Sequence, residues 1–199
     1  MVARLEPAIT PRPKTGRDKL LAAALDLFSE HGVSGTSLQM IADLLGVTKA
    51  AVYYHFKTKN EIVLALVSPV QEELTALADA AEQQRSRTAR LDTLVGGLID
   101  LIIRNRSLYA VLQGDLTVAH ILDQQGVLPV LGTRLIALLA GPDPEPEELV
   151  AANMLLGGLR DAGFAPQIRQ FDDETLRGHM LTCARRLLRY RRPQQPAAH

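Results

Sequence analysis

The sequence predicts an all-α protein in which a small three-helix head, with a helix-turn-helix, is joined by one long helix to a larger helical body. Leucine and alanine are abundant, whereas aromatic residues make up only 4% of the 199 residues and tryptophan is absent. This composition favours helices over strands. Apolar residues also recur at intervals of three and four along most of the chain, which is the spacing of one helix face.

Residues 1–14 are expected to form a flexible basic arm, because three prolines interrupt them. The basic residues of the arm are Arg4, Arg12 and Lys14. They either follow a DNA backbone or reach a minor groove, or they only keep a disordered terminus soluble. The first helix should begin after Thr15, which forms a capping pair with Asp18, and should run to about His31.

Two short helices joined by a tight turn are predicted within residues 36–59. Ser37 is a good N-cap for the first of them, and Gly46 stands where that helix must end. Glycine adopts the left-handed conformation of such an end without steric cost. Val47 is expected to fill the gap between the two helices, and Thr48 to cap the second.

The second short helix should present an unusual outer face. Val52 and Phe56 are four residues apart and are expected to face inward. The residues that then point outward are Lys49, Ala50, Tyr53 and Tyr54. A positive charge, a small side chain and two rings suit a partner made of phosphates and flat bases. The pattern therefore predicts a helix-turn-helix whose second helix enters a DNA major groove.

The order of residues in this segment is more specific than a helix-turn-helix motif in general. The relevant groups are Thr36-Ser37, Ile41-Ala42, Gly46-Val47-Thr48, Val52-Tyr53-Tyr54-His55-Phe56 and Lys57-Thr58-Lys59, preceded by Leu21, Ala24, Leu25, Phe28 and Gly32. Over residues 15–65 this order resembles the tetracycline-repressor (TetR) family of one-component bacterial regulators. The resemblance implies a homodimer that binds an operator and releases it when a small molecule enters the C-terminal domain.

A set of DNA contacts follows from the outward face and the resemblance. Lys49, Ala50 and Tyr53 should face the major groove. The other expected DNA-binding residues, which should contact or lie beside the backbone, are Thr36, Ser37, Gln39, Thr48, Tyr54, His55 and Lys59. Residues 1–60 carry eight Lys/Arg and five acidic residues, a net charge of +3, against −3 for the remainder. This asymmetry agrees with one DNA-binding end, although chance placement of charges explains it equally.

The head is assigned to residues 15–58, the ligand-binding and dimerisation body to residues 59–192, and a flexible tail to residues 193–199. The long helix should run from Lys59 to about Gln84, and Pro69 inside it should produce a kink. Such a kink either gives the helix a place to bend between two sites or has no regulatory role. Further helices are expected near Thr88–Asn105, Ser107–Gln113, Leu116–Asp123, Leu128–Leu139, 146–162 and Asp172–Arg191.

The last two helices carry more apolar surface than one face needs. The helix at 146–162 is apolar on nearly all sides, and the last helix carries an apolar stripe. These helices either form a four-helix dimer bundle, as the resemblance implies, or pack within one subunit. The expected interface residues are Leu149, Leu156, Leu159, Leu176, Met180, Cys183, Ala184 and Leu187.

The body should also hold a mostly apolar pocket with a few polar groups. The expected walls are Leu94, Leu98, Leu101, Leu108, Leu112, Val118, Met154 and Leu155. The expected orienting groups are Arg104, Asp115, His120 and Asn153. For each of these residues, an ordinary place in the core or on the surface is the alternative.

No catalytic, cofactor-binding or metal-binding residue is predicted. His179 and Cys183 are one helical turn apart, but a metal site needs further ligands. The glycine pairs at 96–97 and 157–158 follow no strand, so they are not phosphate loops and instead allow close packing or room for a ligand.

A single cysteine, the lack of a secretory signal and the lack of a membrane-spanning run indicate a cytoplasmic protein. The main hypothesis is thus a DNA-binding, ligand-responsive regulator. The alternatives are a small helical enzyme and a protein–protein interaction module that has lost DNA binding.

Overall fold

The computed structural model describes residues 15–113, 115, 118, 120–122, 126–163, 165–168 and 170–189. Within these ranges every regular element is a helix, which confirms the predicted all-α class. Contacts between residues divide the chain into two compact units, Met1–Ile62 and Val63–His199. The expected basic arm at 1–14 and the expected tail at 193–199 lie outside the described residues.

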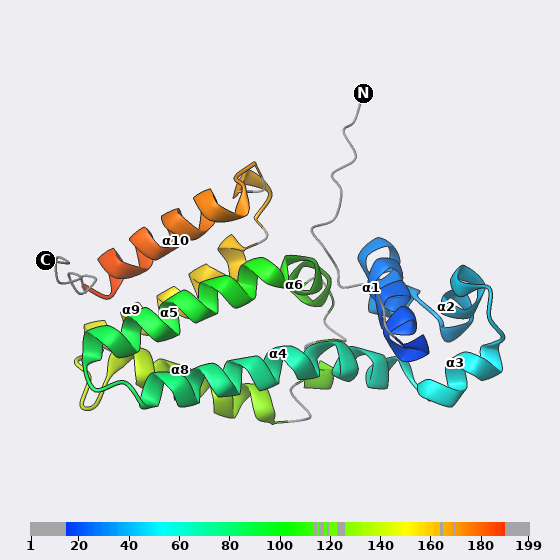
Figure 1. The fold of residues 1–199 in the computed structure, drawn as a ribbon, viewed down its shortest axis with the longest axis horizontal. Helices are drawn as coiled ribbons and strands as arrows, with labels where there is room; N and C mark the ends of the chain where they lie inside the picture. The colour runs from blue at the N-terminus through cyan, green and yellow to red at the C-terminus, as the bar shows by residue number, and fades with distance from the viewer. Residues whose placement is uncertain are drawn as a thin grey trace, which may run out of the picture. The chain divides into compact units, whose positions relative to one another are not determined.

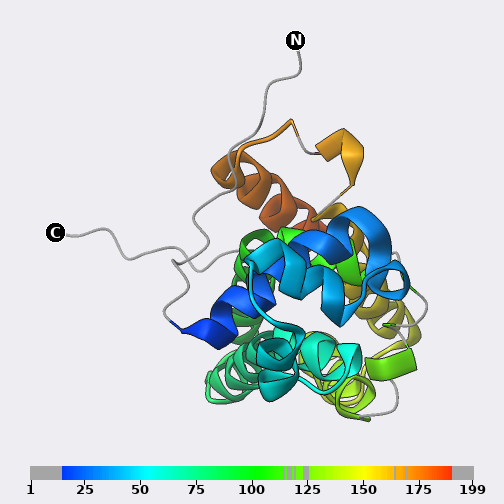
Figure 2. The ribbon, with the colours of Figure 1, turned by 90° about the vertical axis from the view of Figure 1, so that its right-hand side faces the viewer.

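The first unit consists of α1 (Gly16–Gly35), α2 (Leu38–Leu45), α3 (Lys49–His55) and the start of α4 (Figures 1 and 2). The predicted capping pair is present: Thr15 Oγ1 accepts from the Asp18 N–H at 3.2 Å, and Asp18 accepts from the Thr15 N–H at 3.1 Å. The regular part of α1 is interrupted at Gly32, whose φ is 70°, in agreement with the expected end near His31, and a short helical segment continues to Gly35. The unit is held together by buried side chains from all three helices, including Leu20, Ala24, Phe28, Val33, Ile41, Ala42, Val52 and Phe56.

The turn between α2 and α3 has the predicted caps. Ser37 accepts from the Met40 N–H, Thr48 accepts from the Ala51 N–H, and Gly46 adopts a left-handed conformation with φ of 65°. The expectation that Val47 fills the gap between the helices is wrong, because 42% of its surface is exposed. The left-handed turn instead directs the Val47 N–H back to the Ala42 carbonyl, at 3.0 Å, while its side chain meets solvent.

The second unit contains most of α4 (Lys59–Glu82) and the helices that follow it. These are α5 (Arg87–Arg104), α6 (Arg106–Gln113), α8 (Val127–Ala140), α9 (Pro146–Ala162), the 3-10 turn η1 (Pro166–Ile168) and α10 (Asp173–Leu187). Residues 118 and 120–122 are helical, and the rest of the expected helix at 116–123 lies outside the description. α4 stays helical through Pro69, so a bend there remains a prediction. α10 ends at Leu187, four residues before the expected Arg191.

The core of the second unit surrounds α5, which contacts α8, α9 and α10 (Figure 1). Its central residues include Leu91, Leu94, Val95, Leu98 and Ile99, all essentially buried. Two ion pairs fasten α10 to α5: Arg177 Nε lies 2.5 Å from Asp100, and Arg185 Nη2 lies 3.1 Å from Asp92. The hydrogen bonds that Arg177 donates to Asp100 raise the pKa of Arg177.

A third set of ion pairs fastens α4 to α8. Arg134 reaches Asp79 at 2.6 Å and Glu82 at 2.8 Å. The hydrogen bond from Arg134 lowers the pKa of Glu82. Among the described residues, no helix is long and apolar enough to cross a membrane.

Candidate nucleic-acid interface

The outer face of α3 is the candidate surface for DNA. Val52 is fully buried and Phe56 nearly so, as predicted, which fixes the orientation of the helix in the first unit. Tyr54 is consequently 80% exposed, and Tyr53 is also exposed. Lys49 and Ala50 are exposed on the same short helix. The face that the spacing predicted is therefore open to a partner.

Three cations around α3 rest on neutral groups. Lys49 Nζ lies 5.5 Å from the centre of the Tyr53 ring, and the guanidinium of Arg17 lies 5.1 Å from the centre of the Phe56 ring. Lys57 Nζ donates to the Tyr53 carbonyl at 2.5 Å. Within the described residues, none of these three cations forms an ion pair with a carboxylate, so each keeps its charge available for an anion.

The arginines of the body have partners of another kind. Seven of them pair with carboxylates: Arg87, Arg104, Arg106, Arg134, Arg160, Arg177 and Arg185. Their charges are largely compensated within the chain. The charges of Arg17, Lys49 and Lys57 beside α3 are thus open to an anion, whereas those of the seven body arginines are paired.

Two of the expected DNA-binding residues form hydrogen bonds with backbone carbonyls of the head. Thr36 is only 2% exposed, and its hydroxyl donates to the Leu27 and Gly32 carbonyls at 3.2 and 2.8 Å. Lys59 is half-buried, and its Nζ donates to the Val33 and Ser34 carbonyls at 2.6 and 3.1 Å. Both side chains satisfy carbonyls near the end of α1. Thr36 is too deeply buried for a direct DNA contact, which corrects that expectation, whereas Lys59 is only half-buried and its place beside the DNA backbone stays a prediction.

The other expected backbone contacts remain exposed. Ser37 and Thr48 use their oxygens as acceptors for helix caps, which leaves their hydroxyl hydrogens able to donate. Gln39 is exposed and donates to Asp43 at 2.7 Å. The His55 ring lies edge-on to Tyr54, with the ring centres 5.1 Å apart. Contact between these residues and DNA stays a prediction.

The expected pocket residues of the body do not form one set. Leu94, Leu98 and Leu155 belong to the main core cluster. Leu101, Leu108 and Val118 are buried outside that cluster, and the Leu112 side chain lies outside the description. Burial raises the pKa of Tyr109, an interior polar group that the sequence did not single out.

The expected orienting groups are mostly on the surface. Arg104 is exposed and lies 2.6 Å from Glu73, and Asn153 is exposed and donates to the Leu149 carbonyl at 2.8 Å. His120 is also exposed, Asp115 is half-buried, and Met154 is 60% exposed. An orienting role of Arg104, His120 and Asn153 toward a ligand stays a prediction, and the structure places all three at exposed positions. Helical spacing alone does not distinguish such surface positions from interior ones.

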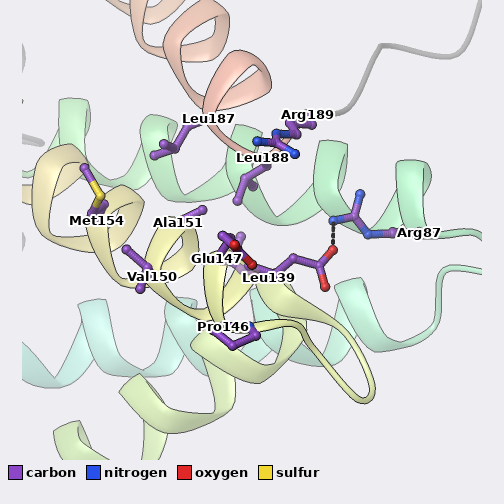
Figure 3. A pocket seen from close by; sticks show the side chains of 11 residues that line it. Arg87, Leu139, Pro146, Glu147, Val150, Ala151, Met154, Leu187, Leu188 and Arg189 are labelled. Atoms are coloured by element: carbon purple, nitrogen blue, oxygen red, sulfur yellow. Dashed lines mark ion pairs between the residues drawn. The ribbon is translucent and has the colours of Figure 1, made fainter.

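Two adjoining cavities lie along α9 and α10. One, of about 510 Å³, is lined by Met154, Leu155, Gly158, Leu159, Ala162, Ile168, Phe171, Leu176, His179, Met180, Cys183, Ala184 and Leu187. The other, of about 560 Å³, has an apolar wall from α9 and α10 and a charged edge where Arg87 lies 3.5 Å from Glu148 (Figure 3). Met154 and Leu187 line both cavities, which therefore adjoin, and the two together are called the groove along α9 and α10 below.

The expected interface residues differ in how exposed they are along this groove. Leu159, Leu176, Met180 and Ala184 are buried in the core of their own subunit, but they also line the first of these cavities, so their contact with a partner stays a prediction. Their stripe faces the core because it is the side of each helix nearest α5. Leu156 and Leu187 are half-buried, whereas Leu149 and Cys183 are exposed. Val150 and Phe171 are exposed apolar residues that the sequence did not assign, and Met154, expected as a pocket wall, is exposed as well.

Comparisons with known proteins agree with this geometry. Residues 20–66 match the family described as "Bacterial regulatory proteins, tetR family". The transcriptional regulator TtgR of Pseudomonas putida is 41% identical over 68 residues, which is 34% of this chain and 32% of TtgR. The matched segment thus spans about a third of this relative's length.

The likeness to solved structures extends over most of the chain. PfmR from Thermus thermophilus, a TetR-family regulator, has a TM-score of 0.68 at 22% identity, covering 90% of this chain and 99% of PfmR. SmeT in complex with triclosan has a TM-score of 0.66 at 22% identity, covering 87% of this chain and 90% of SmeT. At this identity the likeness shows the fold.

The head and the helical body together define a protein of the helix-turn-helix regulator class. The family match over the head and the fold over the whole length narrow that class further. Over residues 20–66 the chain matches the TetR family of bacterial regulatory proteins, and over 90% of its length it has the fold of a TetR-family structure.

Proposed function

We propose that this protein is a ligand-responsive transcriptional regulator, a repressor that binds a pseudo-palindromic operator as a homodimer. One observation carries the proposal: α3 exposes Lys49, Ala50 and Tyr53, and the cations around it are held by rings and carbonyls. A surface of this kind attracts the phosphate backbone through its charge and reads base edges through its side chains. TtgR, which shares the head, is named a transcriptional regulator.

Lys49 has the role of a base-reading residue in this proposal. It is the first residue of α3, and the N-terminal residues of a recognition helix are those that meet base edges. Its contact with the Tyr53 ring holds the two side chains together on one exposed patch. A lysine ammonium can donate to the O6 and N7 acceptors of guanine.

The test compares binding to DNA from the protein's own upstream region with binding to a random-sequence duplex. The parent should prefer one specific site by a factor of about 10³ or more. Lys49→Ala should change which sites are selected from a random library, whereas Arg85→Ala, which removes an exposed cation of the body, should not. A parent that binds all duplexes equally would contradict the proposed regulator function.

The homodimer is proposed to form through the groove along α9 and α10. Val150 and Met154 are exposed beside it, and a cavity floor of core leucines lies between the two helices. Gly157, Gly158 and Gly178 have open space where a side chain would stand. Interior helix glycines each cost about 1 kcal/mol relative to alanine. Packing inside the subunit does not require them, so close approach by the helices of a second copy explains them.

The charges along α10 also favour a second copy of the chain as the partner at this groove. α10 begins with Asp173 and Glu174 and ends with Arg185 and Arg186. When the twofold axis of a dimer is perpendicular to α10, the helix runs antiparallel to its mate, so Glu174 can lie near Arg186 of the other copy, whereas Asp173 and Arg185 already pair with Arg106 and Asp92 of the same subunit. The same surface thus complements itself.

Sedimentation of matched variants tests the dimer. Met154→Glu should convert the parent dimer to monomer at micromolar concentration, because it places an unpaired charge in an apolar contact. Val130→Glu changes an exposed apolar residue of α8, away from the groove, and should leave the dimer intact. A monomeric parent, or a Met154→Glu variant that stays dimeric, would refute this interface.

The effector is proposed to be a small, largely hydrophobic molecule that enters the body. Leu101, Leu108 and Val118 are buried outside the main core cluster, and we propose that they line the effector site. SmeT, which shares the fold, has been solved with triclosan. Binding in the body must then disfavour the arrangement in which two recognition helices fit adjacent half-sites.

A further inference from the structure

We propose that Arg17 is an additional contact to the DNA phosphate backbone, held beside the end of the recognition helix by the ring of Phe56. The inference rests on the proposed DNA binding and adds a residue that the sequence pattern did not single out. Its contact would lie at the opposite end of α3 from Lys49.

Two contacts place the start of α1 against the end of α3. The guanidinium carbon of Arg17 lies 5.1 Å from the centre of the Phe56 ring, and Phe56 is the residue that caps α3. A side-chain carbon built on Gly16 would lie 3.8 Å from His55 Nε2. Arg17 itself is exposed. A cation from the first helix therefore stands next to the recognition helix, although about 40 residues separate them in sequence.

The contact with Phe56 uses only one face of the guanidinium. The N–H donors of arginine lie in the plane of the group and point away from its edge, so stacking on a ring leaves them free. Carboxylates on the neighbouring segments are engaged elsewhere: Asp18 accepts from the Thr15 N–H, and Glu61 accepts from the Lys57 N–H. Arg17 forms no ion pair within the described residues. It thus presents a charged fork of the shape that binds phosphate oxygens.

The position of Lys59 makes this contact more important. The sequence pattern assigns a phosphate contact at this end of the motif to Lys59, but its ammonium is bound to the Val33 and Ser34 carbonyls. Arg17 supplies an exposed cation in its place. Lys57, whose Nζ lies on the Tyr53 carbonyl, extends the same positive surface.

The experiment measures binding to a random-sequence duplex over a salt series, because the electrostatic contact does not depend on base sequence. Removing one phosphate contact with Arg17→Gln should weaken binding and reduce the slope of log K against log salt by about one. Arg17→Lys keeps the charge and should keep the slope. Lys19→Gln removes an exposed cation two residues away on α1 and should leave the slope unchanged.

Thermal unfolding of the same variants separates binding from packing. If Arg17→Gln lowers the melting temperature but leaves the slope unchanged, Arg17 only covers the Phe56 ring and the proposal is wrong. It is also wrong if Lys19→Gln lowers the slope equally, because the effect is then one of total charge. Absence of salt-dependent binding by the parent would instead refute the proposed function itself.

Discussion

Lys59 shows how a single side chain can belong to a DNA-binding motif and still serve the fold. Its ammonium closes the end of α1 by donating to two carbonyls, at 2.6 and 3.1 Å. Carbonyls at a helix end have no partner within the helix, so an external donor satisfies them. The first residue of α4 is thereby fastened to the end of α1 inside the head.

This position gives a prediction for Lys59→Met. Loss of the two charge-assisted hydrogen bonds should lower the free energy of unfolding by about 1–3 kcal/mol. The salt slope of DNA binding should not change, because the ammonium is not presented to the backbone. Lys57→Met should do the reverse, since Lys57 is exposed beside α3. Urea unfolding and a salt series measure both. A lower slope with unchanged stability for Lys59→Met would contradict the structure.

For single residues, the sequence predicts which side chains face inward better than it predicts which groups they bind. The inward positions of Val52 and Phe56 follow from helical spacing, which is a local property. The partners of Thr36 and Lys59 lie 9 and 26 residues away in the chain. Periodicity carries no information about such contacts, so it predicts an exposed side chain for both residues, whereas Thr36 is buried and Lys59 is half-buried.

Adjacent glycines in α5 show how much the packing of two helices depends on one position. A side-chain carbon on Gly97 would collide with Leu77 of α4, which packs against the core of the body. A side-chain carbon on Gly96 would find its nearest neighbour, Arg177 Nη2, at 3.8 Å. Gly97 therefore allows α4 and α5 to approach closely, whereas nothing around Gly96 requires glycine.

The two glycines thus predict opposite effects of the same substitution. Gly96→Ala should stabilise the protein by about 0.5–1 kcal/mol, because alanine is the better helix former. Gly97→Ala gains the same propensity but must displace Leu77, and overpacking of this kind costs about 1–3 kcal/mol. Chemical denaturation measures the difference between the variants. Equal stability of the two would mean that Leu77 rearranges without cost.

Element boundaries were predicted within a few residues where local signals mark them. The pair of Thr15 and Asp18 starts α1, Pro146 starts α9, and Gly141 follows the end of α8. The apolar stripe of α10 was equally visible in the sequence, but not which surface it meets. A stripe that packs on α5 of the same subunit has the same spacing as one that packs on a second copy.

Across the whole molecule, the head and the body differ in which groups hold their positive charges. Its net charge is zero, yet the cations of the head rest on rings and carbonyls while seven arginines of the body pair with carboxylates. Attraction to DNA should therefore act on the head, with the body contributing little. The pairs between Arg134 and α4, and between Arg104 and Glu73 of α4, instead fix α4 within the body.

This arrangement makes α4 the element through which an effector can act. It begins in the head, where Lys59 binds the end of α1, and continues into the body, where Glu73, Asp79 and Glu82 bind arginines of α5 and α8. An effector that favours a body conformation with α4 displaced must lower operator affinity. A coupling of about 1–3 kcal/mol corresponds to a 5- to 150-fold loss.

Reciprocity supplies the measurement, because operator DNA must weaken effector binding by the same factor that the effector weakens operator binding. A hydrophobic compound that raises the melting temperature of the dimer should therefore bind the free dimer more tightly than the DNA-bound dimer. Arg104→Gln removes one attachment of α4 and should change the coupling factor while leaving effector affinity for the free dimer nearly unchanged. If every compound that binds the body has equal affinity for the free and DNA-bound dimer, the two sites are uncoupled and the protein binds DNA constitutively.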